Sequence, residues 1–112
     1  MPSRAKQVAV VDKSRRMPIT TTRVDLNGEY KGWWAIMRSN PPLKTFLALQ
    51  AEANFDDMRA NLKPLVLEWN FVDDNGEPIP TGNFDEIGIP LFGLLINGYL
   101  SKVAEVSAVP KA

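Results

Sequence analysis

The spacing of apolar residues changes between Met37 and Pro42, and this change limits the folds that the chain can adopt. Before Met37, in the segment that starts at Ile19, β-branched and aromatic residues are frequent, as they are in strands. After Pro42 apolar residues recur every three or four positions, as on one face of a helix. Strand signals followed by helix signals predict an α+β domain, with an N-terminal β-hairpin packed on a small bundle of three to four helices.

The length of 112 residues fits one domain with one core. We expect this domain at 19–106, between a basic flexible arm at 1–18 and a frayed C-terminus at 107–112. The arm has a net charge of +4 and the remainder −4. We interpret the arm as a terminus attracted to its own acidic body, or ordered against a neighbour in an assembly. Nucleic-acid binding is disfavoured because no aromatic residue is interspersed with the basic ones.

The hairpin is predicted from Asn27-Gly28, the dipeptide that best supplies the positive φ angles of a tight turn. It predicts strands at roughly 19–26 and 29–37. Trp33 and Trp34 must then lie on opposite faces of the second strand, because side chains alternate along a strand.

We expect Trp34 to pack on the helices, because its face carries Tyr30 and Ile36 and no charge. The face of Trp33 includes Lys31. Trp33 then either contacts a partner or is covered by the arm or a loop.

Two helical patterns follow. In the first, Ser39 or Asn40 is the expected cap, and the prolines after them suit a first turn. Its expected apolar stripe is Leu43, Phe46, Leu47 and Ala51. The second pattern runs from Phe55 to Trp69 and is interrupted by Pro64, which predicts either a kink or a fresh start near Asn61.

The segment 70–80 is predicted to be a small hairpin or Ω-like loop, held to the body at both ends. Its Asp, Asn, Gly and Pro residues are typical of turns. An EF-hand loop would need an acidic residue where Phe71 stands, so a calcium site is disfavoured.

The last predicted element is a helix that Pro90 opens, after a short turn capped by Asn83 or Asp85. Its apolar residues lie nearly all round the helix, so it is either central to the core or shared with another subunit. Gly93 and Gly98 would permit close backbone approach.

Catalysis is disfavoured by the composition, because the chain contains no histidine and no cysteine. No glycine-rich phosphate loop is present, and the paired carboxylates fall at expected helix starts or turns. We therefore expect a protein that is not an enzyme, without cofactor or metal. No secretory signal is evident and no apolar run approaches the roughly 20 residues of a membrane span, so a cytoplasmic protein is expected.

Two segments of the chain are "GEYKGWWAIMRSNPPLKTFLAL" at 28–49 and "LKPLVLEWNFVDDNGEPIP" at 62–80. In pattern and order they resemble small tail assembly chaperones of long-tailed bacteriophages. The nearest similarity is the pattern W-N-x-x-D-x-x-G-x-P-x-P, which is matched by Trp69, Asn70, Asp73, Gly76, Pro78 and Pro80. The resemblance covers roughly residues 24–106.

The resemblance implies a non-enzymatic protein of the host bacterial cytoplasm that binds the phage tape measure protein and tail tube subunits during tail assembly. For that role the candidate partner-binding residues are Trp33, Leu91, Phe92 and Leu95, because large apolar side chains accept a partner helix. Homo-oligomers are compatible with this role. The alternative is a structural virion component, in the tail or the head–tail connector, that forms a ring.

Overall fold

The computed structural model describes residues 15–51 and 54–106. Over these ranges the chain forms a three-stranded antiparallel sheet, three α-helices and three short 3-10 turns, so the predicted α+β class is confirmed. In chain order the elements are β1 (Thr21–Asp25), η1 (Gly28–Tyr30), β2 (Trp34–Arg38), α2 (Leu43–Gln50), α3 (Phe55–Leu62), η2 (Lys63–Leu65), β3 (Val66–Trp69), η3 (Phe84–Glu86) and α4 (Ile89–Val106). Most of the predicted arm, and the whole predicted frayed end, lie outside the described residues.

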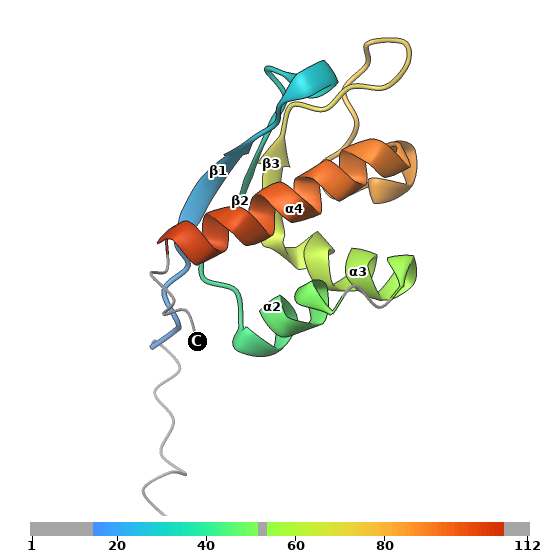
Figure 1. Ribbon diagram of the computed structural model, residues 1–112. Coiled ribbons are helices and arrows are strands. Elements are labelled where there is room, and N and C mark those ends of the chain that lie inside the picture. Colours follow the sequence, from blue (N-terminus) through green and yellow to red (C-terminus); the bar gives the residue numbers. More distant parts are fainter. Residues whose placement is uncertain (1–14, 52–53, 107–112) are drawn as a thin grey trace, which may run out of the picture.

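The sheet has the order β1-β2-β3, with both pairs antiparallel. Figure 1 shows α4 lying across one face of the sheet, with α2 and α3 beside α4 on the side away from η1. The core lies between this sheet face and the helices. Val24 of β1, Ala35 of β2 and Trp69 of β3 form one buried row across the sheet.

The hairpin connection is longer than the sequence predicts. Asn27 is extended, with φ of −124°, so a two-residue turn with positive φ at both central positions does not form. The amide of Leu26 instead donates to the carbonyl of Trp33 at 2.9 Å, and η1 lies inside the resulting loop. Residues 29–33 therefore lie outside the second strand, and the side chain of Trp33 packs against the core.

The predicted face of β2 is wrong. Ala35 and Met37 are fully buried, while Trp34 and Ile36 lie half-buried on the opposite face. The sheet pairing explains this, because β1 adds Arg23 and Asp25 to the face of Trp34. The Arg23 guanidinium lies 5.2 Å from the centre of a Trp34 ring. A face that carries these charges favours contact with water over contact with the helices.

The predicted helix through Trp69 is also wrong, because Pro64 lies in the 3-10 turn η2 and the chain then enters β3. Pairing of β3 with β2 shifts register between Ile36 and Met37, so Leu67 is an extra, unpaired residue. This bulge leaves Leu67 and Glu68 exposed and buries Val66 and Trp69. The buried residues of β3 are therefore three positions apart, which is also the spacing of a helix.

Helix α2 starts later than predicted, and neither expected residue caps it. Pro42 occupies the cap position. The Asn40 side chain accepts from the amide of Thr20 and donates to the carbonyl of Pro18, so it holds the start of β1. The expected stripe of α2 is wrong as well, because Leu49 is buried while Leu43 and Leu47 are exposed.

The segment 70–80 forms the predicted small hairpin-like loop. Val72 and Pro78 make a β-bridge, and the Asp73 side chain accepts the amides of Asn75 and Glu77. Gly76 adopts the expected positive φ, 79°. The loop is held to the body on both sides, because Phe71 before it and Ile79 after it are buried.

Pro90 lies in the first turn of α4, as predicted. The short turn before it lacks the predicted cap, because Asn83 makes no side-chain capping bond there and Asp85 binds Arg59 instead. The hydroxyl of Tyr99 in α4 donates to the carbonyl of Arg38 at 2.6 Å. Burial raises the pKa of Tyr99 well above its ordinary value, so the phenol stays protonated and can donate.

Trp69→Ala should destabilise the protein by about 3–5 kcal/mol. The indole is buried, stacks on Phe71 with ring centres 4.5 Å apart, and donates its N–H to the carbonyl of Ile79 at 2.7 Å. Urea denaturation followed by circular dichroism measures the change. A loss below about 1 kcal/mol would show that the residue is peripheral.

Gly93→Ala and Gly98→Ala should have opposite effects on stability. An added Cβ at Gly93 meets nothing within 4 Å, so alanine should stabilise α4 by about 0.5–1 kcal/mol. At Gly98 the Cβ would lie 2.9 Å from Cγ1 of Val24. Because Val24 is buried and β-branched, overpacking should cost about 1 kcal/mol or more. Equal midpoints in urea denaturation would contradict this packing of α4 on β1.

Candidate functional site

The outward side of α4 is apolar and uncharged over most of its length. No charged residue occurs between Ile89 and Ser101. We call its exposed part the α4 ridge, which consists of Ile89, Pro90, Gly93, Leu94 and Asn97. Ile89 is 69% exposed and Leu94 41%. Most helices that cover a sheet turn charged residues outward, so this ridge is an unusual surface for a helix that is otherwise part of the core.

A cleft runs along one side of the ridge, between α3 and α4. We call it the α3 cleft. It is lined by Phe55, Met58, Ile89, Phe92, Gly93, Ile96, Asn97 and Leu100. At the start of α4 it shares Phe55, Ile89 and Phe92 with a neighbouring pocket, which is also lined by Arg59, Phe84, Asp85 and Ile87. The lining is mainly apolar, and the side chain of Phe55 at its edge is 57% exposed.

A second cleft lies on the other side of the ridge, between η1 and α4. We call it the η1 cleft. It is lined by Asn27, Gly28, Glu29, Tyr30, Pro90, Gly93, Leu94 and Asn97. Gly93 and Asn97 line both clefts. Gly93 and Asn97 therefore lie between the two clefts.

A continuous row of aromatic rings connects the two clefts beneath the start of α4. The row runs through Tyr30, Trp33, Phe71, Trp69, Phe84, Phe92 and Phe55, and successive ring centres are 4.5–6.1 Å apart. Its first member lines the η1 cleft and its last lines the α3 cleft. The shape of both clefts is thus fixed by the packing of the core.

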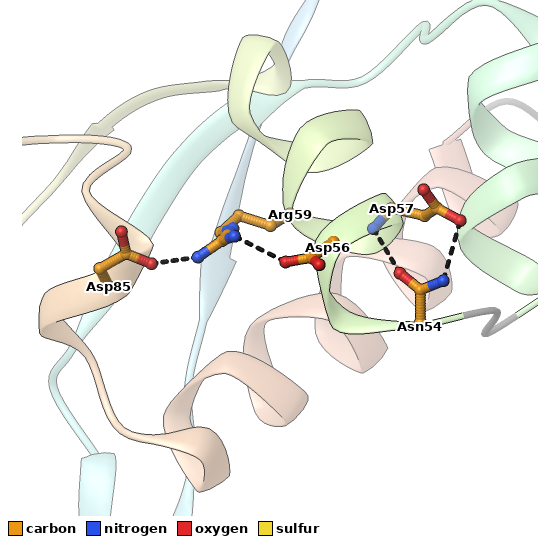
Figure 2. A network of polar contacts seen from close by, with 5 residues as sticks. All are labelled: Asn54, Asp56, Asp57, Arg59 and Asp85. Carbon is orange, nitrogen blue, oxygen red and sulfur yellow. Dashed lines mark hydrogen bonds and ion pairs between the residues drawn. The ribbon is translucent and has the colours of Figure 1, made fainter.

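A polar network lies at the start of α3 (Figure 2), and two of its members, Arg59 and Asp85, line the pocket next to the α3 cleft. Arg59 lies between two carboxylates: Nη2 is 2.7 Å from Asp56, and Nη1 binds Asp85 of η3. Asn54 caps α3 by accepting the amide of Asp57 at 2.8 Å. These groups are exposed, so each ion pair contributes little stability, on the order of 0–1 kcal/mol. Two carboxylates share one guanidinium, and Lys63 lines the same hollow as these three groups. Asp57 and Glu86 add two more carboxylates in the first turns of α3 and η3, so this border keeps an excess of negative charge.

The structure places the predicted partner-binding residues mostly below the surface. Leu91 and Leu95 are buried in the core and line neither cleft. Phe92 is buried too, but it forms part of the floor of the α3 cleft. Trp33 is half-buried, with its ring centre 5.6 Å from that of Phe71. Partner binding by these four residues stays a prediction, but of the four only Phe92 lines one of the two clefts.

The exposed residues that sequence reasoning missed are Phe55, Ile89 and Leu94. The sequence pattern places Phe55 in a helical apolar stripe and Leu94 among many apolar residues around the last helix. Only the directions in which α3 and α4 pack show which of these side chains face outward. The uncharged stretch between Ile89 and Ser101 was the available sequence signal.

Comparisons with protein-family models, with curated proteins and with solved structures find no match for this chain. Within 15–51 and 54–106, no three acidic side chains gather in a way that could hold a metal ion. Over the same ranges no helix is both long enough and apolar enough to cross a membrane. The surface around α4 is the candidate functional site.

Trp33→Ala should cost more stability than Trp34→Ala. Trp33 packs on Tyr30 and Phe71, with ring centres 5.2 and 5.6 Å away, so its removal should cost about 2 kcal/mol. Trp34 packs against Arg23 on the open face of the sheet, and its removal should cost about 1 kcal/mol or less. Urea denaturation of the two variants under one condition tests this order. The reverse order would mean that Trp34 faces the core.

Proposed function

We propose that this protein is a non-enzymatic tail assembly chaperone of a long-tailed bacteriophage. It binds the tape measure protein and tail tube subunits during tail morphogenesis, in the cytoplasm of the host bacterium. The identity of the partners is supported by the sequence resemblance over roughly residues 24–106. The mode of binding is supported by the surface around α4.

One observation carries the proposal: an uncharged helix ridge with an apolar cleft on each side. Contiguous apolar surface bordered by polar groups is costly to leave in water and marks interaction sites. A ridge between two hollows fits the side chains of an amphipathic helix, which project on both sides of its apolar stripe. Phe55, Ile89 and Leu94 supply exposed apolar contacts for such a helix. Tape measure proteins are long and helical, as the family resemblance implies.

The resembling segments supply the scaffold that holds this surface. Asn70 donates its side-chain amide to the carbonyl of Gly32 and accepts the amide of Trp34, so it joins β3 to the hairpin. Trp69 and Asp73 fix the loop at 70–80. These residues of the resembling pattern stabilise the fold and do not form the binding surface. The binding surface can therefore differ between proteins that bind different partners.

A structural virion component that forms a ring is the alternative. It is favoured by the edge of the sheet, because β1 is an edge strand of the described sheet. Met17 and Ile19 are exposed just before β1. An edge strand with apolar residues beside it can pair with a neighbouring subunit.

Affinity capture from phage-infected cells tests the proposed function. The full chain carries a C-terminal tag, and bound proteins are identified by mass spectrometry. Recovery of tape measure and tube proteins, together with absence of the protein from purified particles, is the expected result. A fixed copy number in purified particles would instead identify a structural component.

A matched pair of variants controls this capture. Leu94→Glu places a charge on the α4 ridge, whereas Leu67→Glu places the same charge on the exposed side of β3. Leu94→Glu should reduce recovery of the tape measure protein about tenfold or more, and Leu67→Glu should leave it unchanged. Both side chains are partly exposed, so both variants should fold.

A further inference from the structure

We infer that the α4 ridge and its two clefts receive one amphipathic helix, whose basic residues lie beside the first half of α4. This inference rests on the proposed function and adds the chemistry of the bound segment. The ridge would lie between two rows of apolar side chains of the partner helix, and each row would occupy one cleft.

The small residue at the centre of the ridge and the length of the α3 cleft indicate that the bound segment is a helix. At its centre Gly93 has no side chain, and the space around its Cβ direction is open to at least 4 Å. The backbone of a partner helix can therefore approach α4 closely at this point. From Ile89 to Leu100 the α3 cleft follows α4 for about 16 Å, the length of about three helical turns. An occupant of this length presents enough side chains to fill both clefts.

The charge around the clefts determines which charge a bound helix would carry. Glu29 lines the η1 cleft, and Asp85 lines the pocket next to the α3 cleft. Asp56 and Asp85 share Arg59, and Lys63 lines the hollow beside them. Asp57 and Glu86 lie in the first turns of α3 and η3, so acidic side chains still outnumber basic ones here. The other end of α4 is balanced, since Lys102 pairs with Glu105 at 3.7 Å. Negative charge in excess at one end only favours a helix with lysine or arginine at the corresponding end.

A second copy of the chain fits the surface less well. It would present the same ridge, which has no charged residue between Ile89 and Ser101, and so no basic group to place beside Asp85. It would also set ridge against ridge and leave the clefts unfilled. The observations therefore favour a different chain with a basic, amphipathic helix.

The test uses two synthetic peptides of about 18 residues, long enough to cover the ridge with a margin. They share one leucine stripe; one carries a cluster of lysines at one end, and the other glutamates in their place. Circular dichroism first matches their helicity. Binding to the full chain is measured by fluorescence anisotropy at low and high salt. The lysine peptide should bind about tenfold more tightly at low salt, with a smaller ratio at high salt.

Two sets of variants locate the binding. Leu94→Ala should weaken binding of the lysine peptide about tenfold, whereas Leu67→Ala, the same change at a comparably exposed leucine on β3, should have no effect. Glu29→Gln combined with Asp85→Asn should remove most of the preference for lysine and leave binding of the glutamate peptide unchanged or stronger.

Equal affinity for the two peptides would overturn the charge assignment. Equal effects of Leu94→Ala and Leu67→Ala would overturn the site. A concentration-dependent dimer in light scattering that Leu94→Ala disrupts would assign the surface to a second copy. These outcomes are separable from the proposed function, because capture of tape measure protein by wild type and Leu94→Glu alike would retain the function and reject the site. Failure to capture the tape measure protein, with binding of the lysine peptide intact, would reject the proposed function and retain the site.

Discussion

The stacking of Trp69 on Phe71, with the indole N–H bound to Ile79, is the contact on which the rest of the structure depends. It joins the end of β3 to both ends of the 70–80 loop. Through Phe84 and Phe92 the same ring packing reaches α4, and then Phe55 of α3. A small domain has a limited core, and here one row of aromatic rings supplies much of it.

Helix α4 has two roles that place opposite demands on its sequence. Its inner side fills the core and packs closely on β1 at Gly98, where Val24 is adjacent. Its outer side, between η1 and α3 in Figure 1, keeps apolar and small residues where a solvated helix would carry charge. Because members of one packed aromatic row line both clefts, the outer surface can stay open to a partner without collapsing.

The location of the candidate site depends on packing directions that a linear pattern does not contain. The apolar positions of the last helix predicted a helix that is either central or shared, and the structure gives it a central position with an open outer side. Leu91 and Leu95 are buried, whereas Leu94 is on the ridge, although all three are leucines within two turns. Periodicity gives the relative angle between residues on a helix, but the side that meets the sheet is set by tertiary contacts.

The sequence by itself determined the α+β class, the order of hairpin before helices, the loop at 70–80 and the start of α4 at Pro90, because turn residues and proline act through local backbone geometry. Only the tertiary structure decided that 66–69 is a strand and that Ala35, and not Trp34, faces the core. The bulge opposite Ile36 and Met37 gives β3 a helix-like spacing of buried residues. The charges that keep Trp34 outward belong to β1. In both cases the deciding residues lie on a neighbouring strand, so their effect exists only once the strands are paired.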